Sequence, residues 1–216
     1  SKEINKDYVE VDILKYDCDD EKYCKIVNNV RGNPCNPIMI NNICDYEPRT
    51  KIILDKIIEL YNQGRDILFL SDRRNHLVYI HDFLILNGYD CGYYIGGMKQ
   101  NELKISQEKK IILGTFSMAS EGMDIPKLNS IILGSPKSDI EQSIGRILRQ
   151  PEHIRKFHPY VFDMWDNFAN FTNQYNKRLK FYTKNKYDIN IVSNGVRTKY
   201  KKERKKKINN SVCLID

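Results

Sequence analysis

The sequence predicts an α/β fold in which helices cover both faces of a central, mostly parallel sheet. Short apolar segments alternate with helical segments along the middle of the chain, which is the pattern of a buried parallel sheet. Clusters of polar residues follow directly after several of these segments, where such sheets bind ligands. With 216 residues, 41% of them hydrophobic, the chain is long enough for a substantial core.

The predicted strands of the sheet are short, mostly apolar runs at 66–70, 91–95, 110–114, 130–134 and 160–164. Helices are predicted around them, over 48–61, from a cap at Ser71 or Asp72 to Gly88, and over 99–107. Right-handed crossovers between parallel strands place such helices on both sides of the sheet, so a doubly wound, three-layer sandwich is expected.

The chain divides into four predicted segments. Residues 1–48 hold a strand at 8–14, which enters from another domain, and then an irregular insertion or linker with one short helix. The main α/β domain is 49–166, followed by a helical extension at 167–196 and a basic, flexible tail at 197–216. The first residue is Ser, so we expect the chain to be part of a longer protein.

The net charge of +7 comes mostly from the tail, because 197–207 contains eight basic residues and one acidic residue. Such a run is typical of a polyanion-binding segment, although a solvated or sorting tail is an equally open interpretation. In the extension, a helix over 167–186 has an aromatic stripe that predicts core packing. Its basic residues are predicted to lie largely away from that stripe and to face solvent or a nucleic-acid backbone, and they are Lys177, Arg178, Lys180 and Lys184.

Six cysteines, no membrane-length apolar run and no signal-peptide pattern predict an intracellular, reducing environment with free thiols. The four cysteines before residue 45 have irregular spacing without a C-x-x-C pair, so no metal site is predicted.

The stretch 138–149, SDIEQSIGRILR, is predicted to form a helix with one polar and one apolar face. Gln142, Arg146 and Arg149 fall at i, i+4 and i+7, on one stripe, with four Ile and Leu side chains opposite. Ser138 and Glu141 fit a capping box at its start. Two guanidinium groups and an amide on one face suit phosphate oxygens, while a solvated charged face is the alternative.

Polar residues gather where the predicted strands end. Ser71, Asp72 and Arg73 follow one strand, and Gly96 and Gly97 follow the next. The third strand is followed by Thr115, Ser117 and the tetrapeptide 121–124, EGMD. Hydroxyls and glycine backbone at one sheet edge hold phosphates, and a carboxylate beside glycine accepts from a ribose hydroxyl. Taken singly, each of these residues also suits a cap or a turn.

Three of these stretches together resemble a known family. ILFLSDRR, IILGTFSMASEGMDIP and QSIGRILRQ, in that order, are similar to motifs IV, V and VI of superfamily 2 helicases. The set looks most like the second RecA-like domain of phage and large-DNA-virus DExH helicases, including the poxvirus transcript-release type. The resemblance covers residues 50–165 and implies a RecA-like sandwich and a nucleic-acid-dependent ATPase.

The resemblance also implies roles for particular residues. Arg146 and Arg149 would be arginine fingers acting on the γ-phosphate of ATP, with Gln142 beside them. Gly122 and Asp124 would border the nucleotide. The nucleic-acid backbone would be held by residues at the ends of three strands, namely Ser71, Arg73, Gly97, Thr115 and Ser117.

No G-x-x-x-x-G-K-[ST] sequence occurs, and Asp19-Asp20-Glu21 resembles a DExx box only in composition because no phosphate loop precedes it. We therefore expect ATP and Mg²⁺ to be held mainly by a preceding RecA-like domain, and the chain alone to be inactive. We expect the protein to be a monomer that does not associate with a membrane. A non-catalytic nucleic-acid-binding module and a protein-interaction domain are the alternatives, and DNA and RNA both stay open as partners.

Overall fold

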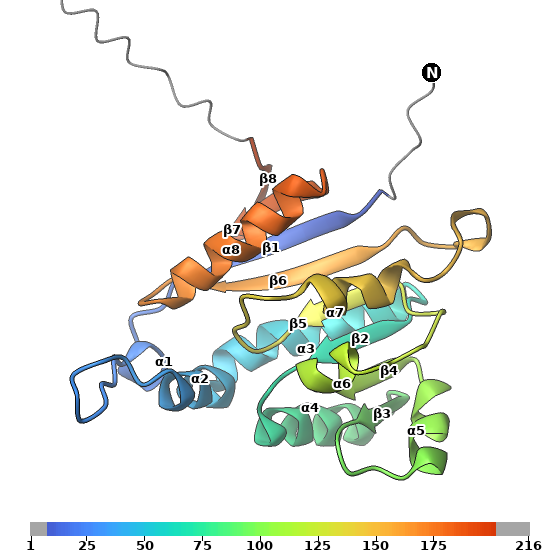
Figure 1. The fold of residues 1–216 in the computed structure, drawn as a ribbon, viewed down its shortest axis with the longest axis horizontal. Helices are drawn as coiled ribbons and strands as arrows, with labels where there is room; N and C mark the ends of the chain where they lie inside the picture. Colours follow the sequence, from blue (N-terminus) through green and yellow to red (C-terminus); the bar gives the residue numbers. More distant parts are fainter. Residues whose placement is uncertain (1–7, 202–216) are drawn as a thin grey trace, which may run out of the picture.

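An eight-stranded sheet organises residues 8–201, the part of the chain that this computed structural model describes (Figure 1). The strand order is β3-β4-β2-β5-β6-β1-β7-β8, and every neighbouring pair is parallel except β7 and β8. The predicted α/β class with a mostly parallel central sheet is confirmed. The prediction for 202–216 lies outside the described residues.

All five predicted central strands are present. The eight strands are β1 (Glu10–Tyr16), β2 (Ile67–Leu70), β3 (Cys91–Tyr94), β4 (Ile111–Gly114), β5 (Ser130–Leu133), β6 (Tyr160–Asp166), β7 (Asp188–Ser193) and β8 (Val196–Lys199). β1, predicted at 8–14, lies between β6 and β7 within the same sheet. The domain boundaries after residues 48 and 166 stay predictions.

Helices form around the sheet largely where apolar spacing predicts them. The α-helices are α1 (Glu21–Cys24), α2 (Asn36–Asp45), α3 (Glu47–Asn62), α4 (Arg74–Leu86), α5 (Gln100–Gln107), α6 (Phe116–Ser120), α7 (Glu141–Gly145) and α8 (Phe171–Lys184). Two short 3₁₀ helices follow α7, namely η1 (Arg146–Leu148) and η2 (Glu152–Ile154). No helix of the described residues is both long enough and apolar enough to cross a membrane.

Two apolar clusters, one on each side of the sheet, give the three layers that the sequence predicts. On one side, Leu68 and Ile131 pack with residues of α5, α6, α7 and α8. On the other, Phe69 and Ile132 pack with α3 and α4. Successive residues of one strand therefore enter opposite clusters, as expected for a strand buried on both faces.

Several local predictions are wrong. The start of α4 has Arg73 as its N-cap with no side-chain capping bond, so neither Ser71 nor Asp72 caps this helix. Segment 17–48 contains two helices, α1 and α2, instead of one, and they share a small apolar cluster around Tyr23 and Met39. The helix predicted over 167–186 begins only at residue 171.

The beginning of the predicted tail is a strand. Residues 196–199 form β8, which pairs antiparallel with β7. Arg197 is held there by ion pairs with Glu10 and Asp12 of β1. Paired charges and a backbone ladder outweigh the polarity of this segment, which is why a prediction based on apolar runs misses the hairpin.

Candidate nucleotide and nucleic-acid site

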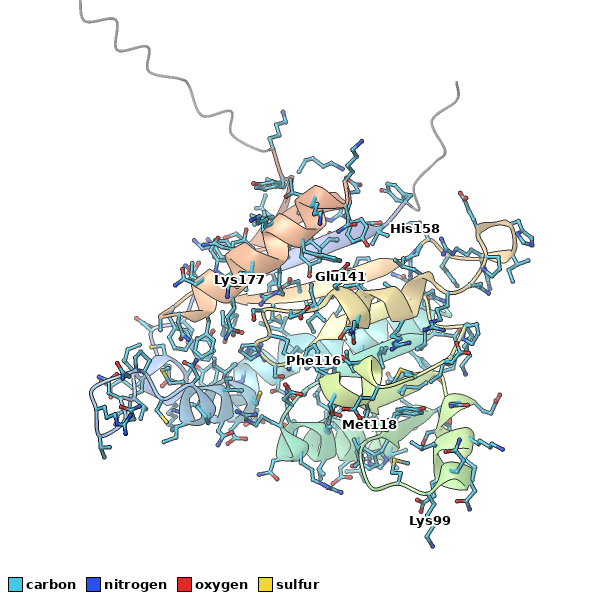
Figure 2. The ribbon with its side chains drawn as sticks, in the orientation of Figure 1. Lys99, Phe116, Met118, Glu141, His158 and Lys177 are labelled. Carbon is cyan, nitrogen blue, oxygen red and sulfur yellow. The ribbon has the colours of Figure 1, made fainter. Side chains whose placement is uncertain are left out.

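The loops that follow β2, β4 and β5 meet at one edge of the sheet, because these strands are neighbours there. Asp72, after β2, joins all three loops. Its carboxylate accepts a hydrogen bond from the backbone N–H of Phe116 (3.3 Å) and pairs with Lys137 Nζ (2.9 Å). Its own N–H donates to Ser135 Oγ (2.9 Å). Figure 2 shows Phe116 on α6 and Glu141 at the start of α7, the helices that these loops carry.

The arginine-bearing stretch differs from its prediction. The helix predicted over 138–149 is the five-residue α7 followed by η1, and its N-cap is Ile140, which makes no side-chain capping bond. The predicted capping box of Ser138 and Glu141 is therefore wrong. Residue 137 lies in the loop before α7, where its carbonyl accepts a 2.6 Å hydrogen bond from Arg178. The apolar face is as predicted, since Ile144 and Ile147 are buried.

The guanidinium group of Arg146 binds backbone carbonyl groups of the same chain. Its guanidinium donates to the carbonyl oxygens of Ala119, Ser120 (3.0 Å) and Met123 (2.8 Å), and the residue is only 8% exposed. Burial, and then the neighbouring charge of Arg149, lower the pKa of Arg146. All of its nitrogens are engaged, so this side chain ties η1 to the loop after α6.

Arg149 is placed differently. Its Nη1 forms an ion pair with Asp124 Oδ1 at 2.9 Å, and the two side chains are 42% and 67% exposed. Gly122, two residues earlier in the same loop, is exposed and has a φ of +112°, which favours glycine. Gln142 is exposed on α7. The structure thus brings Arg149 and Asp124 together on the surface and leaves both open to a ligand.

The residues predicted to hold a nucleic-acid backbone fall into two groups. Gly97 is exposed in a turn with a φ of +87°. Thr115 caps α6 by accepting from the N–H of Met118 (3.3 Å), and its hydroxyl lies 3.3 Å from that of the exposed Ser117. These two hydroxyls form a small polar surface after β4.

Ser71 and Arg73 are engaged inside the chain. Ser71 is fully buried, and its hydroxyl lies 3.1 Å from His76 Nδ1 and accepts from the N–H of Arg73. A phosphate cannot reach that hydroxyl without displacing these partners. The Arg73 guanidinium donates to Asn41 Oδ1 (2.5 Å) and to the carbonyl of Pro37 (3.3 Å), so it fastens α2 to the strand edge.

His76 connects Ser71 to α3, and no feature of the sequence marks it. Its Nε2 lies 3.2 Å from the hydroxyl of Thr50, and the residue is 1% exposed. Burial, together with the charge of Arg49, lowers the pKa of His76 to about 3. The ring is therefore neutral near pH 7 and serves as a hydrogen-bonding link.

Two buried arginines also shape this edge. Arg49 of α3 makes a bidentate pair with Asp166 at the end of β6 (2.7 and 3.0 Å) and donates to the carbonyl of Gly134 (2.8 Å). Arg178 of α8 makes a bidentate pair with Asp163 (2.8 and 2.7 Å) and donates to the carbonyl of Lys137.

These two pairs hold the loop that leads into α7 from both faces of the sheet, since α3 and α8 lie on opposite sides. The prediction that Arg178 lies away from the aromatic stripe is wrong, because it is 3% exposed between Tyr175 and Tyr182. Tyr182 itself donates to Asp163 (2.7 Å), which completes the hydrogen bonding of that carboxylate.

A metal site is not evident in residues 8–201, where no three His, Cys, Asp or Glu side chains are grouped to hold an ion. The five described cysteines, among them Cys44 and Cys91, are free thiols. Burial raises the pKa of Cys44 to about 11 and that of Cys91 to about 12, so both stay protonated.

A known family and several known proteins are similar to this chain. Residues 50–150 match the helicase conserved C-terminal domain. Over 182 residues the chain is 40% identical to L396 of Acanthamoeba polyphaga mimivirus, whose name describes a candidate ATP-dependent RNA helicase. That alignment covers 82% of this chain and 35% of L396, so the chain spans about a third of that relative.

A poxvirus protein and two solved structures are also similar. The chain is 34% identical over 113 residues to transcript termination protein A18 of Fowlpox virus, covering 47% of this chain and 24% of that protein. T4 UvsW superposes with a TM-score of 0.63 at 23% identity, over 86% of this chain and 41% of UvsW. The C-terminal domain of the DEAD-box protein Dbp5 superposes with a TM-score of 0.57 at 15% identity, over 88% of this chain and 92% of that domain. Both superpositions bear on the fold alone.

Proposed function

We propose that the chain carries the C-terminal RecA-like domain of a superfamily 2 helicase and that this domain is the second half of an ATP-dependent DNA or RNA motor. The observation that carries the proposal is the exposed Arg149–Asp124 pair at the strand edge where parallel sheets bind ligands. A guanidinium in this position suits the charge that spreads over a transferring phosphoryl group.

We infer that Arg149 and Gln142 face the γ-phosphate, and that Arg146 is a positioning residue. All three nitrogens of Arg146 donate N–H groups to backbone carbonyls, whereas only Nη1 of Arg149 is engaged, by one exposed carboxylate. An exposed ion pair is worth less than about 1 kcal/mol, so a phosphate can replace Asp124 as the partner of Arg149 at little cost. Asp124 would then be free to accept from a ribose hydroxyl beside Gly122.

The residues of this chain can contact a bound triphosphate from one side only. The sequence has no phosphate-loop motif, so we propose that a preceding domain cradles the phosphates and holds Mg²⁺. Bound ATP supplies the phosphoryl group that is transferred to water. This chain contributes the guanidinium of Arg149, the amide of Gln142 and the rigid edge that aims them.

Nucleic acid is proposed to contact Gly97 and the hydroxyls of Thr115 and Ser117. These groups lie after β3 and β4, are accessible, and suit backbone phosphates without reading bases. Affinity is therefore expected to be insensitive to sequence and to fall steeply with salt. We also propose that the protein is a monomer and that it is intracellular, and the free thiols favour the intracellular location.

The proposal is tested by ATP hydrolysis in two preparations. The 216-residue chain alone is expected to hydrolyse no ATP, with or without nucleic acid. A polypeptide that joins the chain to a phosphate-loop domain is expected to show hydrolysis stimulated by nucleic acid. Hydrolysis by the chain alone contradicts the division of labour, and nucleic-acid binding without any hydrolysis by the joined polypeptide favours the non-catalytic binding module.

A further inference from the structure

A groove of about 440 Å³ lies between the C-terminal half of α8 and the residue that follows β8. It is lined by Asn176, Leu179, Lys180, Thr183, Lys184 and Tyr200. Leu179 and Tyr200 are partly buried against the main core, so the apolar wall of the groove is fixed in place. The two lysines are exposed at its rim.

The surface around the groove is basic, and few acidic residues are available nearby to neutralise its charge. Segment 167–201 contains one acidic residue, Asp188, which already pairs with Lys199 and accepts from Tyr8. Lys180 and Lys184, by contrast, form no ion pair with any residue between 8 and 201. Directly after Tyr200, the sequence places six basic residues and one acidic residue within 201–207.

We propose that this groove, which we call the α8 groove, binds single-stranded nucleic acid. A base would stack on the ring of Tyr200 over Leu179, and the flanking phosphates would pair with Lys180 and Lys184. Single-strand binding sites combine an aromatic platform with a basic track in this way and tolerate any base. The charge of the surface fits a polyanion, and the half-buried ring suits a stacked base.

The α8 groove is separate from the surface proposed above. Tyr200 donates its N–H to Ile189 at the start of β7, at the edge opposite the loop of Thr115. α8 runs between these two edges over 14 residues, which is about 21 Å of helix. Exposed Lys177, visible on α8 in Figure 2, lies along the same path. A strand held at the first edge can therefore continue along α8 into the groove.

The inference rests on the proposed function in one respect, namely that nucleic acid is the partner. A rival occupant is the chain's own segment 202–216. Its sequence is strongly basic next to the groove, so lysines at the rim disfavour it electrostatically.

The test measures binding of a fluorescent oligo(dT) and an oligo(U) of about 20 nucleotides to the 216-residue chain by anisotropy, over a series of salt concentrations. The double variant Lys180→Glu/Lys184→Glu is expected to bind at least about tenfold more weakly at low salt. The slope of log affinity against log salt is expected to flatten by about 1.4, since each phosphate contact on a single strand contributes about 0.7. The matched control, Lys25→Glu/Lys51→Glu, has the same change in net charge at exposed positions elsewhere and is expected to keep the slope.

Tyr200 gives a second readout that charge does not affect. Tyr200→Ala is expected to weaken binding about tenfold, and Tyr200→Phe is expected to restore it, because the ring provides the stacking surface. A chain ending at Lys201 separates the two occupants. If the lysine variants affect binding only in that shortened chain, segment 202–216 fills the groove and the inference is overturned.

The outcomes also separate this inference from the proposed function. If the wild-type chain binds the oligonucleotides and the Lys180→Glu/Lys184→Glu variant binds them equally well, the α8 groove is not a contact and the proposed function stands. If the wild-type chain binds neither oligonucleotide at low salt, the nucleic-acid partner itself is wrong, and the groove proposal fails with it.

Discussion

The chain uses the arginine–aspartate pair in two opposite ways. Arg49–Asp166 and Arg178–Asp163 are buried, bidentate and saturated with further hydrogen bonds. Arg149–Asp124 joins the same chemical groups through one nitrogen, at the surface.

The difference shows which pair can exchange its partner. Removing one member of a buried pair leaves an uncompensated charge, whereas an exposed pair opens at almost no cost. The buried pairs also hold both ends of loop 134–137, which leads to α7. The buried arginines, Arg49 and Arg178, therefore fix the loop that positions Arg149, whose exposed ion pair can open. The following predictions test that contrast, beginning with the largest effect.

Arg178→Ala is expected to lower the free energy of unfolding by about 3–5 kcal/mol, because Asp163 is left buried and unpaired. Urea unfolding of the 216-residue chain measures this. Lys180→Ala, two residues away on the exposed face of α8, is the matched control and is expected to change it by less than about 0.5 kcal/mol. Equal losses of stability in the two variants would contradict the distinction between the buried, paired Arg178 and the exposed Lys180.

Arg146→Ala is expected to cost about 2 kcal/mol, because three backbone carbonyls lose a charged donor. The loss should be local, with faster hydrogen exchange of the amides at 119–124 and little change in α3 or α8. Arg149→Ala serves as the control with the same change in charge. If exchange at 119–124 is unaltered by Arg146→Ala, this residue does not hold the loop.

His76 predicts a pH dependence of stability. Its pKa is about 3 in the folded chain and about 6.5 when unfolded, so the unfolded chain binds one more proton in between. Stability is therefore complete above about pH 6.5 and is lost as pH falls, by up to about 1.4 kcal/mol per pH unit. His76→Gln should remove this slope between pH 6 and pH 5, a range in which ordinary carboxylates change little. Parallel slopes for the two proteins would refute the neutral, buried ring.

Asp124→Asn is expected to have the smallest effect on stability, less than about 1 kcal/mol in urea unfolding, because the pair with Arg149 is exposed. The Asp163→Asn variant is the buried counterpart and should cost several times more. A loss of comparable size at the two positions would mean that Asp124 also has a structural role.

The layout of the fold could be predicted from the sequence, but the details of the site could not. Apolar runs such as 111–114 are short enough to be buried strands, and their order along the chain places the strand-end residues at one edge. The burial of Arg178 could not be predicted, although it lies three residues after Tyr175, because its partner Asp163 is brought to it only by tertiary folding. The different fates of Arg146 and Arg149 depend on the change from α7 to η1, which the spacing of the residues does not reveal.

The most direct test of the account is the effect of Arg149→Ala on ATP hydrolysis by a polypeptide that joins this chain to a phosphate-loop domain. We expect nucleic-acid-stimulated hydrolysis to fall at least about 10³-fold, as for an arginine finger, while nucleic-acid binding and the urea midpoint stay within error. Hydrolysis within about tenfold of the unmodified protein, or a parallel loss of binding or folding, would contradict it.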